Sequence, residues 1–205
     1  MKRALELNPG SPDVHLDYGH LLMALGRHDE AIREGRSAEQ LDPVSSRTQS
    51  ALGRFLYRAR KYEEAVPHLE RAVDLEPRNL QAHSRLAEVY AQLGRYSESI
   101  AHFEKIRELT GENGNPNAGL ARVYALMGRK REARQLLNGL KAQSIIIAPA
   151  FVALGDKDEA FRILGKAVDE HNSFLVYLKE DPPFDDLHSD PRWKVLLRRM
   201  NFPED

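Results

Sequence analysis

The chain has 205 residues, of which 41% are hydrophobic and 30% are charged, so it has enough apolar material for a folded core. Its 30 Lys and Arg residues nearly balance its 31 Asp and Glu residues. The formal net charge of −1 argues against binding of nucleic acid or an anionic membrane. The absence of cysteine excludes disulfides, thiolate metal sites and thiol catalysis. The apolar stretch from Ile145 to Leu154 is too short to span a bilayer, so we expect a cytoplasmic protein.

The sequence repeats itself with a period of 34 residues. Three sets of equivalent positions agree on this period: Pro9, Pro43 and Pro77; Ala31, Ala65, Ser99 and Ala133; and Gly26, Arg60, Gly94 and Gly128. A fourth set is always small, which lets two helices approach closely: Gly19, Gly53, Ala87 and Ala121. Each repeat is therefore predicted to be a hairpin of two helices, the first of which ends at the Gly26 position. Because Arg60 occupies that position in one repeat, we expect another residue to close its turn.

Start signals for helices support the hairpins. Ser11-Pro12 and Asn115-Pro116 each place a capping side chain before a proline at the first helical position. No alternating apolar pattern of the strand type persists anywhere in the sequence. We therefore expect an all-α fold.

The repeat resembles the tetratricopeptide repeat family. The residues that carry the resemblance are Leu52-Gly53, Leu56, Ala65, Leu69 and Pro77 in one repeat, and Leu86-Ala87, Tyr90, Ser99 and Phe103 in the next. The tryptophan of the family pattern is replaced throughout, by His15, Gln49, His83 and Asn117. The resemblance implies a right-handed α-α superhelix, a solenoid of about five helical hairpins followed by a C-terminal capping helix.

The period divides the chain into units. We expect a partial repeat over 1–11, full repeats over 12–45, 46–79 and 80–113, a shortened fourth repeat over 114–143, a fifth over 144–171, and a C-terminal turn and capping helix over 172–205. Met1 falls halfway through a second helix. We infer that the chain is cut from a longer protein or that its start codon is misplaced, and the alternative is a genuine half-repeat cap.

The last part of the chain departs from the repeat. Gly128 and Gly155 are only 27 residues apart, so the fifth hairpin is expected to pack with an offset, and Pro149 predicts a kink or a late start in its first helix. The pair Pro182-Pro183 is expected to stop any helix, and Asp190-Pro191 to start a capping helix. Residues 177–200 are similar to the C-terminal ends of bacterial multi-domain signalling proteins. These carry a Ser/Thr kinase or winged-helix domain before a tetratricopeptide array.

No motif for catalysis, nucleotide binding or metal binding is present in the sequence. His15 and His20 are interpreted as a solvated or groove-lining pair, and the acidic pair Asp185-Asp186 as solvent-exposed loop residues. We therefore expect a protein that is not an enzyme, with no catalytic residues, no metal and no cofactor.

The first helix of each hairpin lines the concave wall in this family, and that wall is basic here. We expect a protein or peptide segment, acidic in character, to bind Arg47, Ser50, Arg54, Tyr57, Arg58, Gln81, Ser84, Arg85, Glu88, Asn115 and Arg122. Alternatively, the arginines of the concave wall pair with Asp17 and Glu88 and bind no partner, so that they only make this surface soluble. The alternative function is a self-association module, giving a homo-oligomer, or a structural spacer.

Overall fold

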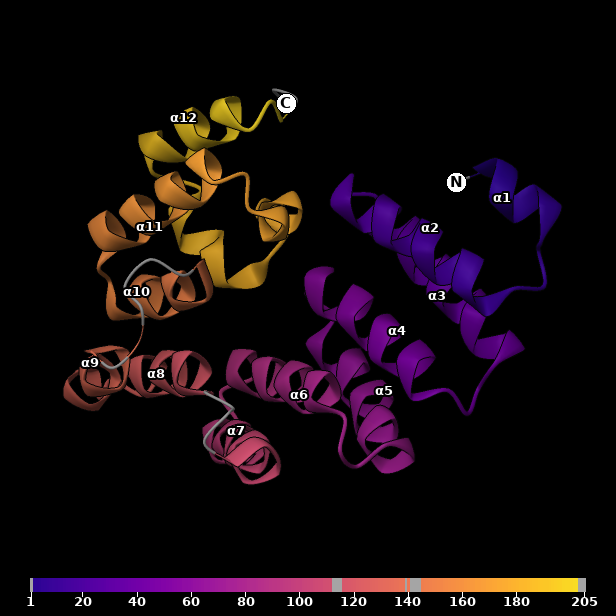
Figure 1. Cartoon of the computed structure of the whole chain (residues 1–205), viewed down its shortest axis with the longest axis horizontal. Helices are drawn as coiled ribbons and strands as arrows, with labels where there is room; N and C mark the ends of the chain where they lie inside the picture. The colour runs from indigo at the N-terminus through magenta and orange to yellow at the C-terminus, as the bar shows by residue number, and fades with distance from the viewer. Residues whose placement is uncertain (1, 112–115, 139, 141–144, 203–205) are drawn as a thin grey trace. The chain divides into compact units, whose positions relative to one another are not determined.

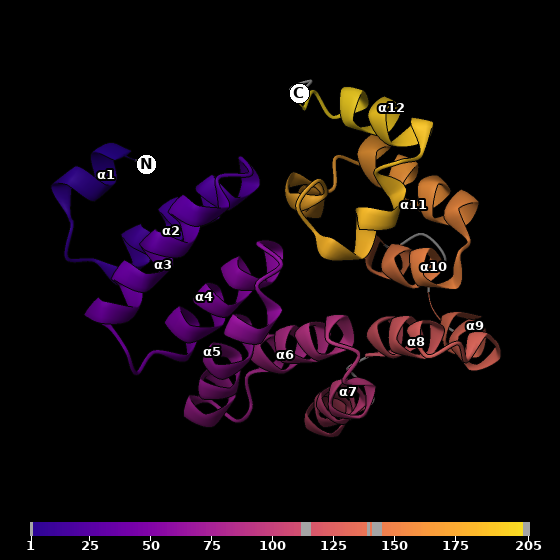
Figure 2. The same cartoon turned by 180° about the vertical axis from the view of Figure 1, so that it is seen from behind.

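The computed structural model describes residues 2–111, 116–138, 140 and 145–202, which fall into two compact units, Met1–Gly114 and Asn115–Asp205 (Figures 1 and 2). The described residues form helices and turns without a β-strand, so the predicted all-α class is confirmed. The helices of the first unit are α1 Lys2–Leu7, α2 Pro12–Ala24, α3 His28–Leu41, α4 Ser46–Arg58, α5 Tyr62–Leu75, α6 Leu80–Gln92 and α7 Tyr96–Thr110. Those of the second are α8 Asn117–Leu126, α9 Lys130–Asn138, η2 Ile145–Ile147, α10 Ala148–Leu154, α11 Lys157–Asp169, η3 Ser173–Tyr177, η4 Pro182–Leu187 and α12 Pro191–Arg199.

Consecutive helices pack as hairpins in both units. The pairs are α2 with α3, α4 with α5 and α6 with α7 in the first unit, and α8 with α9 and α10 with α11 in the second. In the first unit, α4 also contacts the first helices of the neighbouring hairpins, α2 and α6. The predicted fold of helical hairpins is confirmed, and it places α2, α4 and α6 in one layer.

The turn inside each hairpin uses a residue with left-handed backbone. Gly26 and Gly94 have φ of 70° and 71°, as expected for glycines that close a helix. Arg60 itself adopts φ of 59° at the equivalent position, so the expectation that another residue would close this turn is wrong. The backbone there matches the glycine turns, because Lys61 N donates to Leu56 O over 2.9 Å. An L-residue can occupy this conformation at a cost of about 1–2 kcal/mol.

The small repeat positions bring helices into close contact around Phe55. A Cβ atom added to Gly19 would lie 2.7 Å from Phe55 Cε2, and one added to Gly35 would lie 3.0 Å from Phe55 Cδ2. Similarly, a Cβ at Gly53 would lie 2.5 Å from Leu69 Cγ. Phe55 is fully buried, so the ring fills the space that the two glycines of α2 and α3 leave open.

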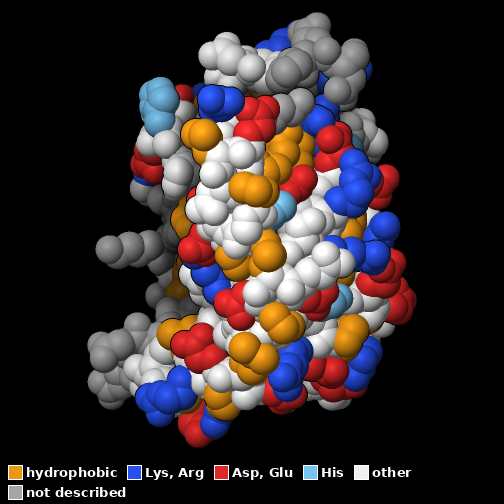
Figure 3. All heavy atoms as spheres, turned by 90° about the vertical axis from the view of Figure 1, so that its right-hand side faces the viewer, with side chains coloured by type: hydrophobic (Ala, Val, Ile, Leu, Met, Phe, Trp, Pro, Cys, Tyr) orange, Lys and Arg blue, Asp and Glu red, His pale blue; other side chains and the backbone are white. Residues whose placement is uncertain are grey.

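Figure 3 shows one face of the molecule, seen from the right-hand side of Figure 1. Acidic and basic side chains alternate on it, with small groups of hydrophobic ones between them. Exposed ion pairs of the first unit include Arg27–Glu30 (2.6 Å) and Arg36–Glu64 (3.3 Å). Exposed pairs of this kind keep a helical surface soluble and add little stability.

Most of the predicted helix starts are present. The Ser11 side chain accepts a hydrogen bond from Val14 N, and the Asp190 side chain accepts one from Arg192 N. Pro149 lies in the first turn of α10, which confirms the expected late start of that helix. Asn115 lies outside the described residues, and α8 begins at Asn117.

The C-terminal part of the second unit covers α10 and α11. No helix runs into the pair Pro182-Pro183, because η3 ends at Tyr177. The pair itself opens the 3₁₀ helix η4, because proline fits the first turn, where its missing N–H is not needed. Trp193 and Leu196 of α12 are buried in the core of this unit, and α12 packs on α11 as the predicted capping helix. Among the described residues, none of the helices has the length and apolar character that crossing a membrane requires.

Candidate functional site

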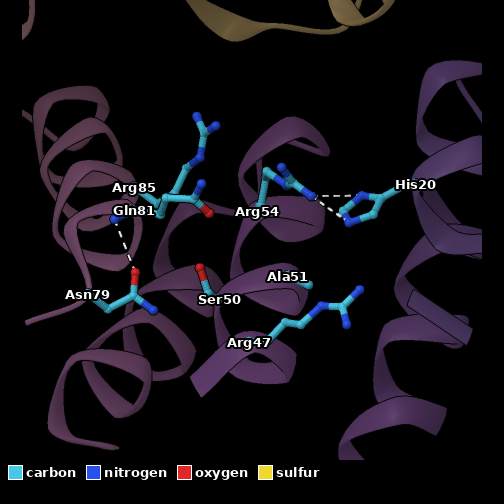
Figure 4. Close-up of a pocket in the computed structure, with 8 residues that line it drawn as sticks. All are labelled: His20, Arg47, Ser50, Ala51, Arg54, Asn79, Gln81 and Arg85. Atoms are coloured by element: carbon cyan, nitrogen blue, oxygen red, sulfur yellow. Dashed lines mark hydrogen bonds between the residues drawn. The ribbon is translucent and has the colours of Figure 1, made fainter. Parts of the chain in front are cut away.

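A pocket of about 160 Å³ opens between the first helices of the three hairpins of the first unit (Figure 4). Its lining residues are His20 from α2, Arg47, Ser50, Ala51 and Arg54 from α4, Asn79 just before α6, and Gln81 and Arg85 from α6. Several of them are equivalent positions of successive repeats, such as His20 and Arg54, or Arg47 and Gln81. The repeat therefore assembles the pocket, because neighbouring helices present the same register to it.

His20 and Arg54 form the best-defined contact in the pocket. Arg54 Nη2 lies 2.8 Å from Nδ1 of the imidazole and 2.5 Å from Nε2. The His20 ring also packs edge-on against Phe55, with 4.9 Å between the ring centroids. Burial, followed by the positive charges of Arg54 and Arg58, lowers the pKa of His20 from 6.5 to about 3. The imidazole is therefore neutral at pH 7 and accepts a hydrogen bond from the guanidinium.

The low pKa of His20 predicts a loss of stability in mild acid. The unfolded chain takes up a proton near pH 6.5 and the folded protein only near pH 3, so the free energy of unfolding falls as the pH drops through this window. Between pH 7 and pH 5, the native protein should lose about 2 kcal/mol more than a His20→Gln variant, since one pH unit corresponds to about 1.4 kcal/mol. Urea unfolding at both pH values measures this difference. Equal losses in the two proteins would contradict the low pKa.

The other two arginines of the pocket have carboxylate partners. Arg47 pairs with Asp13 through Nη1, and its Nη2 lies 3.7 Å from Asp17 Oδ1. Arg85 Nη1 lies 2.8 Å from Glu88 Oε2. The pairs of Arg47 are more than half exposed, so each contributes only ~0–1 kcal/mol and can exchange with an incoming anion.

The structure brings about half of the predicted binding residues together. Five of them line the pocket, namely Arg47, Ser50, Arg54, Gln81 and Arg85. Ser84 and Glu88 lie half-buried on the same helix as Arg85.

Two predicted residues of the first unit, Tyr57 and Arg58, are too buried to join this surface. Tyr57 and Arg58 were expected to face a ligand, but only 2% and 4% of their areas are exposed. The end of α4 is covered there, and the Tyr57 ring packs against Tyr62 at 5.8 Å. Arg122 is buried and belongs to the second unit. Asn115 lies outside the described residues.

The selection of binding residues from the sequence missed three pocket residues. His20 was interpreted only as one of a solvated or groove-lining pair with His15. Its position is equivalent to that of Arg54 one period later, and this equivalence could have assigned it to the same binding surface. Asn79 caps α6, accepting hydrogen bonds from the backbone N–H groups of Gln81 and Ala82 over 3.1 Å, so a capping pattern could have found it (Figure 4). Ala51 has no polar side-chain group, so nothing in its chemistry marked it as a binding residue.

Comparison with known families identifies the repeat. Two models described as tetratricopeptide repeat match the chain, one over residues 50–114 and the other over residues 1–55 and 94–144. The chain belongs to the tetratricopeptide repeat family. Members of this family mediate protein–protein interactions and generally act as non-catalytic scaffolds. Comparison with curated proteins gave no match.

Solved structures with the same fold cover most of this tetratricopeptide repeat protein. Pseudomonas aeruginosa pilF is 24% identical, with a TM-score of 0.58 over 87% of this chain and 84% of that chain. A tetratricopeptide repeat protein of Thermus thermophilus is 20% identical, with a TM-score of 0.63 over 85% and 99%. YrrB, described as having an unusual peptide-binding site, is 17% identical, with a TM-score of 0.54 over 87% and 95%. At these identities the likeness shows the fold alone.

Three of the four positions that carry tryptophan in the tetratricopeptide repeat pattern, His15, Gln49 and His83, hold buried polar residues with structural partners. His15 Nε2 lies 2.9 Å from the carbonyl of Pro9, and His83 Nε2 lies 3.1 Å from that of Pro77. His15 Nδ1 also lies 2.7 Å from Glu34 Oε2. The interpretation of His15 as solvated or groove-lining is therefore wrong, because this side chain is buried and ties a turn to its hairpin. Among the described residues, no group of three or more His, Asp or Glu side chains is placed to hold a metal ion.

Proposed function

We propose that the first unit binds an acidic segment of a partner protein at the pocket between α2, α4 and α6. The observation that carries this proposal is the composition of the pocket, because Arg47, Arg54 and Arg85 line it and none of its lining residues is acidic. This contrasts with the face in Figure 3, where both signs of charge alternate. The family supports the proposal, since its members bind proteins, and so does the peptide-binding site described for YrrB.

Arginine is well suited to this task. Its guanidinium is planar, always charged and able to donate two parallel hydrogen bonds to one carboxylate. The three guanidinium groups come from two neighbouring helices, so an extended segment that crosses the pocket meets more than one of them. His20 is neutral at pH 7, so the positive charge of the pocket comes from its arginines.

We also infer that the chain serves within a larger bacterial signalling or regulatory protein. The support is the similarity of residues 177–200 to the C-terminal ends of such proteins. Pull-down from a bacterial lysate, followed by identification of the genes that neighbour those of the captured partners, would test this context. Capture of partners with no link to signalling would argue against it.

Selection from a random peptide library tests the proposed ligand. Immobilised native protein should enrich peptides with a net negative charge, and an Arg54→Glu, Arg85→Glu variant should not. The matched control is an Arg33→Glu, Arg71→Glu variant, which changes the net charge equally on two exposed arginines of α3 and α5 that do not line the pocket. Enrichment of neutral or basic peptides, or equal enrichment of acidic ones by both variants, would contradict the proposal.

A further inference from the structure

The three arginines of the pocket carry more positive charge than a single carboxylate can balance. Each guanidinium carries five N–H donors, and Arg47, Arg54 and Arg85 all contribute to one lining. Ser50 and Gln81 add a hydroxyl group and an amide to the same lining, both neutral. A side-chain carboxylate offers one negative charge and two acceptor oxygens to this lining.

Competition within the protein also favours a ligand with a higher charge. Arg47 already lies beside Asp13 and Asp17, and Arg85 beside Glu88. A single carboxylate from a partner would only replace one of these carboxylates with another of equal charge. A phosphomonoester carries about −1.5 to −2 charges at pH 7 and three strong acceptor oxygens, so it competes better for the same guanidinium groups.

The size and shape of the pocket limit what part of a ligand can enter. Its volume is about 160 Å³. A phosphate group has a phosphorus and four oxygen atoms and fits this space. Ala51 is the one apolar residue in the lining, which gives little surface for an aromatic ring.

We propose that this pocket binds the phosphate group of a phosphorylated serine or threonine in the partner segment. The inference rests on the proposed function, because it names the acidic group that the segment presents. The arginines of α4 and α6 act as the phosphate ligands, and the hydroxyl of Ser50 and the amide of Gln81 supply neutral donors beside them.

Binding of small capped amino acids tests the phosphate specificity without knowledge of the partner sequence. The probes are N-acetyl-O-phosphoserine N-methylamide, N-acetylglutamate N-methylamide and inorganic phosphate, at pH 7.5 and constant ionic strength. NMR follows the guanidinium Nε–H signals of Arg54 and Arg85 and the imidazole signals of His20. The phosphoserine probe should give saturable shifts, with a dissociation constant at least about tenfold below that of the glutamate probe. An Arg54→Gln, Arg85→Gln variant should lose this difference, and an Arg33→Gln variant should keep it.

Each other outcome overturns the inference. Equal affinity for the phosphoserine and glutamate probes would leave a general carboxylate site, and an absence of saturable shifts would remove the anion site. Tighter binding of inorganic phosphate than of the phosphoserine probe would assign the pocket to free phosphate. The proposed function fails separately, in the library selection, if acidic peptides are not enriched or are equally enriched by the Arg54→Glu, Arg85→Glu variant.

Discussion

Replacing Arg54 and Arg85 together by glutamate is expected to weaken binding of an acidic partner segment by at least about 100-fold. Each substitution removes a charge-assisted hydrogen-bond donor and adds a repulsive charge, and the loss of one well-placed charge partner alone costs about 2–5 kcal/mol. A 100-fold change in affinity corresponds to about 2.8 kcal/mol. The two losses together exceed this value. Fluorescence anisotropy with an acidic peptide from the library selection measures the dissociation constants.

The charge-matched control separates a local effect from a general one. An Arg33→Glu, Arg71→Glu variant has the same net charge but keeps the pocket, so its affinity should stay within about threefold of the native value at an ionic strength near 0.15 M, where distant charges are screened. Both variants should keep the native helix content by circular dichroism. Equal weakening in the two variants would show that the peptide responds to overall charge and does not occupy the pocket.

Replacing Phe55 by alanine is expected to lower the free energy of unfolding by about 3–5 kcal/mol. The ring is fully buried, and it fills the space left by Gly19 and Gly35 while forming one wall behind His20. Its removal leaves a cavity between the first two hairpins that the glycines cannot fill. Urea unfolding at pH 7 measures the change, and Phe174→Ala, at a side chain that is 67% exposed, is the matched control with little expected effect.

A second substitution at the same place tests the packing argument. In the native protein, Gly19→Ala should destabilise, because the new Cβ would lie 2.7 Å from a ring atom of Phe55. In the Phe55→Ala background, the same substitution should be neutral or stabilising, since the clash is gone and a methyl group enters the cavity. Additive effects of the two substitutions would contradict the account of Gly19 as space for the ring.

The repeat made the fold predictable from the sequence. Equivalent small residues at one period, such as Gly19 and Gly53, can be identified without knowledge of distant contacts, and each marks a close approach of two helices. The turn at Arg60 was predicted less well. A period reveals that a position is equivalent to a glycine, but it does not reveal that an arginine will adopt the same left-handed backbone at a moderate energetic cost.

The binding surface was harder to predict, because exposure depends on the neighbouring hairpins. Arg54 and Arg58 are one helical turn apart on α4, yet Arg54 lines the pocket and Arg58 is 4% exposed. Helical spacing places both on one side of the helix, but only the packing of α4 between α2 and α6 decides which of them a ligand can reach. His20 was likewise assigned as one of a pair with His15, although the two side chains have different surroundings.

Protection of a single thiol in the pocket tests the central claim most directly. The chain has no cysteine, so Ser50→Cys introduces one reactive site in the pocket lining, and Ser97→Cys introduces one at an exposed position of α7 as the control. Rates of alkylation are measured with and without the acidic peptide from the library selection. We predict that saturating peptide slows alkylation of the Ser50→Cys variant by at least about tenfold and leaves the Ser97→Cys variant unchanged. Bound peptide that leaves the rate at position 50 unchanged would contradict the assignment of this pocket as the binding site.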